Sequence, residues 1–324
     1  MVYGDNGGAV GWLIGEENRG LNCMFTMMNN ARLAVGLQGV AIAERATQAA
    51  MAYAQDRKQG RAGANASSPI IAHPDVRRML LTMRALTRAA RAICYATGAA
   101  IDRAHHAKDD TARKAADQRA SLLTPVAKAF STDVGMEVAS LGVQVHGGMG
   151  FIEETGAAQH YRDARIAPIY EGTNGIQAID LVARKLPMAG GAVVRSYFDE
   201  LRRTVAHVKA ANDPAFGTTG ARLSDAVESL DRATTWLLGK LDASPDAALA
   251  GATPYLRLFA SAAGGCMLAE DALAGMRHDD AEAPGRVALA RFFAENIAVQ
   301  AGGLETTVTD GAESVADIAL RGAA

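Results

Sequence analysis

The sequence predicts an all-α protein in which a short β segment is followed by two antiparallel helical bundles. Alanine, the residue with the highest helix propensity, makes up about a fifth of the 324 residues. Aromatic residues, which favour strands, make up only 5%. Apolar residues recur at helical spacing over long stretches of the chain. A chain of this length has room for about two domains.

The first elements follow from glycines, prolines and apolar spacing. Residues 1–20 are expected to form one or two short strands, because glycines interrupt short apolar stretches there. From Leu21 to Arg57 the apolar spacing is helical and there is no proline, which predicts one long helix. A second helix is expected to begin at His73-Pro74-Asp75, because proline is favoured in a first turn.

A third helix is expected over Pro125–Val145. The charged stretch Ala104–Gln118 is expected to turn the chain, and Thr124-Pro125 is a typical helix start. Glycines 147, 148 and 150 are expected to end this helix, and a further helix is expected over Ile176–Leu186.

Pro187 and the pair Gly190-Gly191 predict a domain boundary, because proline and paired glycines end helices. The expected units are residues 1–20, 21–187 and 190–324. The last unit shows amphipathic stretches at 195–211, 221–242, 246–276 and 285–302, separated by short turns. This pattern predicts a second antiparallel bundle.

Charge and cysteine content exclude several classes of protein. The 33 Lys and Arg nearly balance the 35 Asp and Glu, so no nucleic-acid partner is expected. No apolar run is long enough for a membrane span, and no signal peptide is evident at the start. Three widely spaced cysteines indicate neither a disulfide framework nor a zinc site. The expected location is therefore the cytoplasm.

A few residues are candidates for chemistry. Glu171 lies in a largely apolar stretch, where poor hydration would raise its pKa toward that of a general base. A helix-capping glutamate would show the same pattern. The glycine run that starts at Gly147 could approach a phosphate or simply end a helix. We expect His105 and His106 to be solvated, Cys94 to be a core thiol, and no metal site.

Several motifs resemble the signature of the flavin-dependent acyl-CoA dehydrogenases. They are, in chain order, Gly15-Glu16-Glu17-Asn18-Arg19-Gly20-Leu21, Asn30-Ala31-Arg32, Asp56-Arg57, Gln144-Val145-His146-Gly147-Gly148-Met149-Gly150, Tyr161-Arg162-Asp163-Ala164-Arg165-Ile166 and Ile169-Tyr170-Glu171-Gly172-Thr173-Asn174-Gly175-Ile176-Gln177. The resemblance covers residues 1–187. Residues 190–324 resemble the additional helical domain of longer bacterial members.

The resemblance implies that FAD-dependent α,β-dehydrogenation converts an acyl-CoA thioester to a trans-2-enoyl-CoA. Glu171 matches the base that removes the α-proton. Some relatives place the base at the position of Ala31, which cannot accept a proton. In the family, the backbone N–H of the base and a flavin ribityl hydroxyl donate to the thioester oxygen.

Further roles are implied residue by residue. Those matching substrate contacts are Asn29, Arg32, Tyr170 and Gly172. Those matching FAD contacts are Arg57, Gln144 and Gly148 toward the neighbouring subunit's flavin, and Thr173 and Gly175 toward the subunit's own flavin. A guanidinium such as that of Arg57 suits a pyrophosphate, because its fork pairs two oxygens at once.

The resemblance also implies partners. Relatives form dimers or tetramers through the first bundle and pass electrons to an electron-transfer flavoprotein. Apolar side chains on the first two long helices, Met24, Met28, Met79, Met83 and Leu86, are expected at a subunit interface. Complete relatives have an N-terminal helical domain and a middle β domain, and this chain is expected to begin in the last strands of the latter.

Several readings therefore stay open. The chain is a fragment, or it works with a separate chain that supplies the missing domains. Alternatively, it is a non-catalytic helical scaffold or oligomerisation module, or an acyl-CoA-binding protein without flavin.

Overall fold

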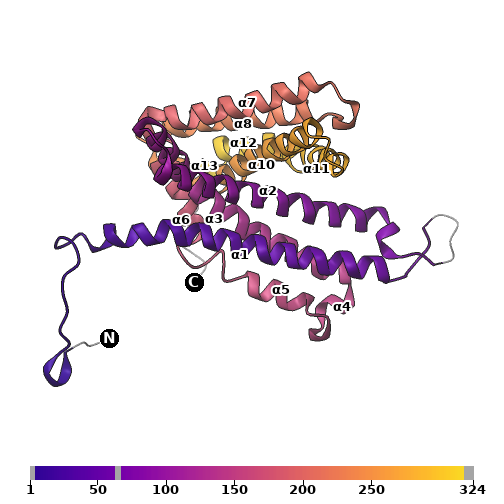
Figure 1. Cartoon of the computed structure of the whole chain (residues 1–324), viewed down its shortest axis with the longest axis horizontal. Helices are drawn as coiled ribbons and strands as arrows, with labels where there is room; N and C mark the ends of the chain where they lie inside the picture. Colours follow the sequence, from indigo (N-terminus) through magenta and orange to yellow (C-terminus); the bar gives the residue numbers. More distant parts are fainter. Residues whose placement is uncertain (1–3, 63–66, 317–324) are drawn as a thin grey trace.

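The computed structural model describes residues 4–62 and 67–316 and confirms the all-α class (Figure 1). No strand occurs in these two ranges; their only β contact is an isolated bridge between Lys58 and Pro69. The helices are α1 (Gly20–Asp56), α2 (Pro74–His106), α3 (Asp110–His146), α4 (Gly148–Phe151), α5 (Ala157–Ala164), α6 (Asn174–Asp180), α7 (Ala192–Ala211), α8 (Thr219–Lys240), α9 (Pro245–Ala250), α10 (Ala252–Arg277), α11 (Ala283–Asn296), α12 (Ala301–Asp310) and α13 (Ala312–Ala316).

The three long helices α1, α2 and α3 form the first bundle, and α1 and α3 approach each other unusually closely. The contact runs through Gly36 and Gly39 on α1 and Gly135 on α3. A Cβ added at Gly36 would lie 2.7 Å from the carbonyl oxygen of Ala127, nearer than real Cβ atoms come. Glycine therefore lets the two backbones touch, with no side chain between them.

The predicted start of the third helix is wrong. Helix α3 begins at Asp110, and Pro125 lies inside it. The chain turns over only a few residues, because the Asp109 side chain accepts a hydrogen bond from Ala112 N at 2.7 Å and caps the new helix. A proline inside a helix removes one backbone hydrogen bond. Here burial of Pro125 and its neighbours in the bundle offsets that loss.

The strands expected within residues 1–20 are also absent from the described part. Residues 4–19 contain one 3₁₀ turn, Asp5–Gly7, and every residue in this segment is exposed. The segment extends away from the bundle (Figure 1). A strand is stabilised by pairing with a neighbour, and none lies beside this segment. Residues 1–3 lie outside the described residues.

The interface prediction is wrong for three of its five residues. Met79, Met83 and Leu86 are buried in the chain's own core. Met24 and Met28 remain partly exposed near the start of α1. The α2 side chains therefore stabilise the monomer, and their apolar character follows from packing against α1 and α3.

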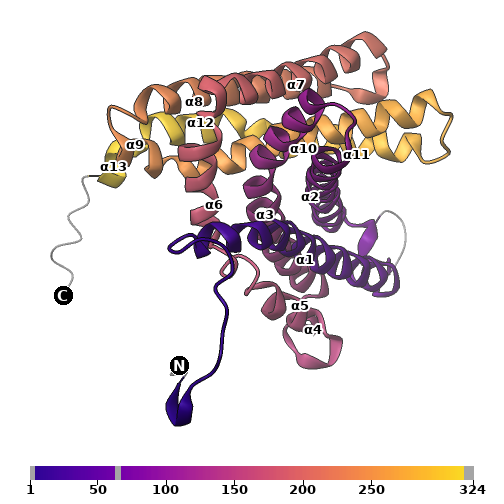
Figure 2. The same ribbon diagram turned by 60° about the vertical axis from the view of Figure 1, so that its left-hand side comes forward.

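The later helices pack over α2 and share one hydrophobic core with the first bundle (Figure 2). Helix α10 is the central element, because it contacts α2, α3 and α6 as well as α7, α8, α11 and α12. The chain passes from the first bundle to the later helices through Met188–Gly191, where Ala189, Gly190 and Gly191 have positive φ. The division near residues 187–190 stays a prediction.

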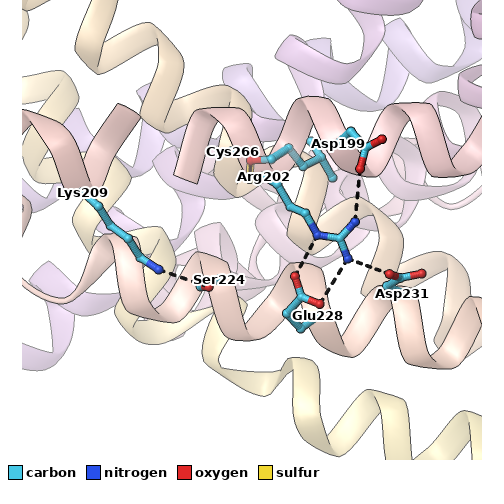
Figure 3. A network of polar contacts seen from close by, with 8 residues as sticks. Asp199, Arg202, Lys209, Ser224, Glu228, Asp231 and Cys266 are labelled. Atoms are coloured by element: carbon cyan, nitrogen blue, oxygen red, sulfur yellow. Dashed lines mark hydrogen bonds and ion pairs between the residues drawn. The ribbon is translucent and has the colours of Figure 1, made fainter. Parts of the chain in front are cut away.

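Arg202 and Lys209 of α7 both form polar contacts to α8 (Figure 3), and Lys209 Nζ donates to Ser224 Oγ at 3.3 Å. The guanidinium of Arg202 donates to both carboxylate oxygens of Glu228, at 2.9 and 3.1 Å, and to Asp231 at 2.6 Å. It also donates to Asp199 on its own helix, at 3.4 Å. The hydrogen bonds from Arg202 lower the pKa of Glu228.

We expect Gly36→Ala to destabilise the protein by roughly 1–3 kcal/mol, because the new methyl group forces α1 and α3 apart. The free energy of unfolding in urea measures the effect. Gly98→Ala is the matched control, since its Cβ would meet only Leu33 Cδ2, at 3.8 Å. The control should be neutral or stabilising by up to about 1 kcal/mol. Equal effects of the two substitutions would contradict the close contact.

We expect Arg202→Met to lower the free energy of unfolding by about 1 kcal/mol at pH 7, as is usual for partly exposed ion pairs. Because the folded-state pKa of Glu228 is lowered, this stabilisation is present above the unfolded pKa and disappears as the pH falls through the folded pKa. The difference from wild type should shrink below about pH 4.5. Arg203→Met, on the same helix, is the control. A pH-independent difference would argue against the ion pair.

Candidate active site

Glu171 lies on a short closed loop, Pro168–Asn174, which we call the Glu171 loop. The backbone N–H of Asn174 donates to the carbonyl oxygen of Pro168 at 3.0 Å and closes it. Glu171 and Gly172 both have left-handed backbones, with φ of 56° and 79°. Glycine is favoured at the second position because its φ of 79° would strain any other residue, and a Cβ there would also lie 2.8 Å from Gln177 Nε2. Glu171 itself is half-buried.

Two buried side chains hold the carbonyl oxygen of Gly172. Lys128 Nζ, on α3, donates to it at 2.9 Å, and Gln177 Nε2, on α6, donates to it at 3.1 Å. Both side chains belong to fully buried residues. Burial lowers the pKa of the Lys128 ammonium to about 8, while the nearby carboxylates of Asp133 and Glu171 oppose this shift.

Asn174 joins the loop to α3 at a second point. Its Oδ1 accepts from Lys128 Nζ at 2.9 Å, and its Nδ2 donates to Asp133 Oδ1 at 2.7 Å and to Ala129 O at 3.1 Å. Thr132 Oγ1 also lies within hydrogen-bond distance of this amide. The amide group is therefore fully engaged, which fixes the loop's exit into α6.

Arg32 forms a buried ion pair with Asp180 of α6. Its Nη1 lies 3.3 Å from Asp180 Oδ2, and the two residues are only 8% and 2% exposed. The guanidinium also lies close to Gly172, since a Cβ on that glycine would be 4.0 Å from Arg32 Nη2. Arg32 Nε has no hydrogen-bond partner among the described residues. Arg32 is therefore a buried charge and not a solvated surface charge.

A polar cavity of about 240 Å³ lies beside this ion pair. Asn29, Asn30, Arg32, Thr124 and Asp180 are among its lining residues. Of the residues matched to substrate contacts, the structure thus places Asn29 on the cavity, Arg32 between cavity and loop, and Tyr170 and Gly172 in the loop. The Tyr170 hydroxyl donates to Gln38 Oε1 on α1.

The residues matched to FAD contacts fall into two groups. Thr173 and Gly175 lie at the start of α6, where Thr173 Oγ1 accepts from Ile176 N at 3.3 Å and caps the helix. Arg57 is exposed at the end of α1. From Arg32 to Arg57 the helix rises by about 37 Å, at about 1.5 Å per residue.

Gln144 and Gly148 lie at the same end of the bundle as Arg57. The rings of Tyr53 on α1 and His146 on α3 stack with a centroid distance of 4.4 Å, which joins the two helix ends. Both Gln144 and Gly148 are exposed, and a Cβ at Gly148 would meet no atom within 4 Å. An exposed guanidinium, an amide and an open backbone have the donor chemistry that an anionic dinucleotide needs.

Lys128 and Asp180 are parts of this site that were not predicted from the sequence. Each is the one charged residue within an apolar run, Leu122–Phe130 for Lys128 and Ile176–Val182 for Asp180. A charged residue within an apolar run indicates a buried, paired charge, because charged residues are almost never fully buried unless they are paired. This pattern could therefore have pointed to both residues. Asp180 also directly precedes a π-helical segment, Leu181–Lys185, a type of irregularity that is frequent at functional sites.

Other sequence predictions can be compared directly with the structure. Cys94 is a buried core thiol, as expected, and His105 and His106 are exposed. Within residues 4–62 and 67–316, no three His, Cys, Asp or Glu side chains are grouped as metal ligands. None of the helices described is long and apolar enough to span a membrane.

Residues 18–186 match the family described as "Acyl-CoA dehydrogenase, C-terminal domain", and residues 197–319 match "Acetyl-CoA dehydrogenase C-terminal like". The chain is 45% identical to 3-methylmercaptopropionyl-CoA dehydrogenase of Ruegeria pomeroyi, over 96% of this chain and 54% of that protein. It is 31% identical to a butyryl-CoA dehydrogenase of Syntrophomonas wolfei, over 92% of this chain and 51% of that protein. The chain thus spans about half the length of the curated relatives it matches.

Solved structures share the fold. ACDH-11 of Caenorhabditis elegans, in complex with C11-CoA, has a TM-score of 0.75 at 18% identity, over 95% of this chain and 50% of that chain. An acyl-CoA dehydrogenase of Bacillus anthracis, complexed with FAD, has a TM-score of 0.73 at 21% identity, over 91% and 50%. Since the first family match covers more than half of the 324 residues, this chain belongs to the acyl-CoA dehydrogenase family.

Proposed function

We propose that this chain forms the C-terminal part of an FAD-dependent enzyme that dehydrogenates an acyl-CoA thioester to a trans-2-enoyl-CoA. The observation that carries the proposal is the Glu171 loop, in which Glu171 has a left-handed backbone and buried side chains hold the carbonyl group of the next residue. The 45% identity to a named acyl-CoA dehydrogenase supports it.

Glu171 would remove the α-proton of the thioester. The backbone N–H of Glu171 makes no hydrogen bond to any residue in the described ranges, so it is available to the thioester oxygen. A donor placed at that oxygen stabilises the negative charge that develops as the proton leaves. One residue would thus provide both the base and an enolate-stabilising donor.

Arg32 and Asn29 would contact the acyl-CoA. Arg32 has an unpartnered Nε, although its charge is already balanced by Asp180. Because Arg32 lines the cavity, its guanidinium can donate to a substrate carbonyl without leaving a buried charge unpaired. Tyr170 and Gly172 would shape the loop side of the pocket, with the Tyr170 ring fixed by Gln38.

FAD would supply the oxidising power by accepting the β-hydride. Thr173 and Gly175 would contact the flavin nucleotide of the same subunit. Arg57, Gln144 and Gly148 would contact that of a neighbouring subunit. This arrangement requires a homo-oligomer, a dimer or a tetramer, and we propose an electron-transfer flavoprotein as the electron acceptor and the cytoplasm as the location.

We also propose that the other half of the acyl pocket comes from a polypeptide that corresponds to the remaining half of the relatives. The relatives are about twice as long as the matched region, and apolar side chains near the start of α1 and in or just before the Glu171 loop are exposed here. Examples are Leu21, Met27, Ile166 and Ile169, which are 68%, 57%, 55% and 46% exposed.

The decisive experiment is the visible spectrum of the purified chain after incubation with FAD and desalting, followed by anaerobic addition of an acyl-CoA. We expect a retained flavin band that bleaches with substrate once a chain carrying the other half has been added. Glu171→Gln should slow the bleaching by about 10²–10⁴-fold, the usual contribution of a general base, while the flavin is retained.

Glu154→Gln is the matched control, because Glu154 is an exposed glutamate outside the loop, and it should bleach at the wild-type rate. A colourless protein would contradict dehydrogenation by this chain alone. If flavin and activity were still missing after a chain carrying the other half had been added, the scaffold role would be favoured.

Arg57→Ala should weaken FAD retention by about tenfold or more, because the exposed guanidinium would lose a charge-assisted contact to the pyrophosphate. Equilibrium dialysis against FAD measures this, with Arg45→Ala on the same helix as a control. The free energy of unfolding should change by less than about 0.5 kcal/mol, since Arg57 is exposed. Unchanged FAD affinity would remove Arg57 from the proposed site.

A further inference from the structure

Lys128 is a buried lysine whose side-chain polar contacts are confined to the Glu171 loop. It lies in the middle of α3 and is fully buried. Its ammonium donates to Gly172 O and to Asn174 Oδ1, both at 2.9 Å, and to no other group among the described residues. An ammonium removed from water at this depth is costly unless its contacts do something that an apolar side chain could not.

Those contacts hold a strained backbone. A non-glycine residue in the left-handed region is uncommon, and it persists where the surrounding structure determines it. Next to Glu171, the Gly172 carbonyl is held from two sides, by Lys128 on α3 and by Gln177 on α6. Gln177 Nε2 also lies 3.4 Å from the carbonyl oxygen of Glu171. The two peptide groups that follow Glu171 thus have fixed directions.

Charge around the ammonium is balanced from several elements. Asp133 lies on the same helix and accepts from Asn174, Glu171 lies in the loop, and Arg32 faces the loop from α1 with Asp180 as its partner. The Lys128 charge is therefore placed between two carboxylates and one guanidinium. Among the described residues, no other cation contacts the loop backbone through a hydrogen bond, so losing Lys128 would remove that contact.

We propose that Lys128 is a positioning residue for Glu171: by binding the Gly172 carbonyl and the Asn174 amide oxygen, it fixes the direction of the Glu171 carboxylate and backbone N–H together. This inference rests on the proposed role of Glu171. Gln177 also holds the Gly172 carbonyl, but it does so from α6, the helix that follows the loop. Lys128 is needed because it anchors the loop to α3.

Hydrogen–deuterium exchange on the full 324-residue chain, without flavin or acyl-CoA, tests the positioning. Lys128→Met removes the donors and the charge but keeps an unbranched side chain of similar size. We expect the amides of residues 170–176 to exchange about tenfold faster or more, while those of residues 134–146 on α3 stay within about twofold. Lys128→Arg, which retains charge and donors, should restore most of the protection.

Lys114→Met, at an exposed position of the same helix, is the matched control and should leave both peptides unchanged. Equal acceleration along α3 would show that Lys128 only stabilises the helix, and unchanged exchange in the loop would show that the loop does not depend on it. Either result overturns the proposal. Because this readout needs no chemistry, it stands apart from the test of dehydrogenation.

A kinetic readout separates positioning from binding in flavin-loaded protein. Lys128→Met should lower kcat about tenfold or more, with the KM for acyl-CoA within about threefold of wild type. An unchanged kcat in a variant whose loop exchanges rapidly would contradict the positioning of Glu171. If neither wild type nor Glu171→Gln retained flavin, that result would count against the proposed function and not against the positioning by Lys128.

Discussion

The contact between the backbones of α1 and α3 is the constraint on which the rest of the molecule depends. Gly36 meets the carbonyl of Ala127, the residue directly before Lys128, and it lies one helical turn after Arg32. Because the helices touch without a layer of side chains between them, the same close approach brings Arg32 and Lys128 to the same side of the Glu171 loop. A wider helix spacing, as between ordinary side chains, would separate Arg32 from the loop that Lys128 holds.

Around the Glu171 loop, the core contains charges that a structural bundle would not need. Lys128 is fully buried, and the Arg32–Asp180 pair is nearly so. Replacing such groups with well-packed apolar side chains often stabilises a protein, so their presence is weak evidence for stability and better evidence for specific placement.

Helix spacing, proline and glycine in the sequence predicted the long helices well, since α1 and the start of α2 lie within one residue of their expected limits. The errors arose where two local signals competed. Asp109 caps α3 fifteen residues before the typical start at Thr124-Pro125, and packing then overrides the proline. The prediction of short strands at the start of the chain was wrong for residues 4–19, because a strand needs a pairing partner and the local sequence pattern does not show whether one is present. Glu171 and Arg32 could be found from motifs, whereas the pairing of Lys128 with a backbone carbonyl 44 residues away depends on tertiary packing.

The length of α1 constrains how a flavin nucleotide could use this chain. Arg57, with Gln144 and Gly148 nearby, lies about 37 Å along the helix from Arg32, at about 1.5 Å per residue. Glu171, Thr173 and Gly175 are at the Arg32 end. Along α3, Lys128, which holds the Glu171 loop, and Gln144 are separated by a rise of about 24 Å, at about 1.5 Å per residue. In the proposed arrangement the two groups contact different flavins, one of the same subunit and one of a neighbouring subunit. If both groups bind flavin, each chain must take part in two sites, and the sites must be shared between copies. The proposed cofactor contacts and the proposed homo-oligomer therefore depend on each other, and evidence against one is evidence against the other.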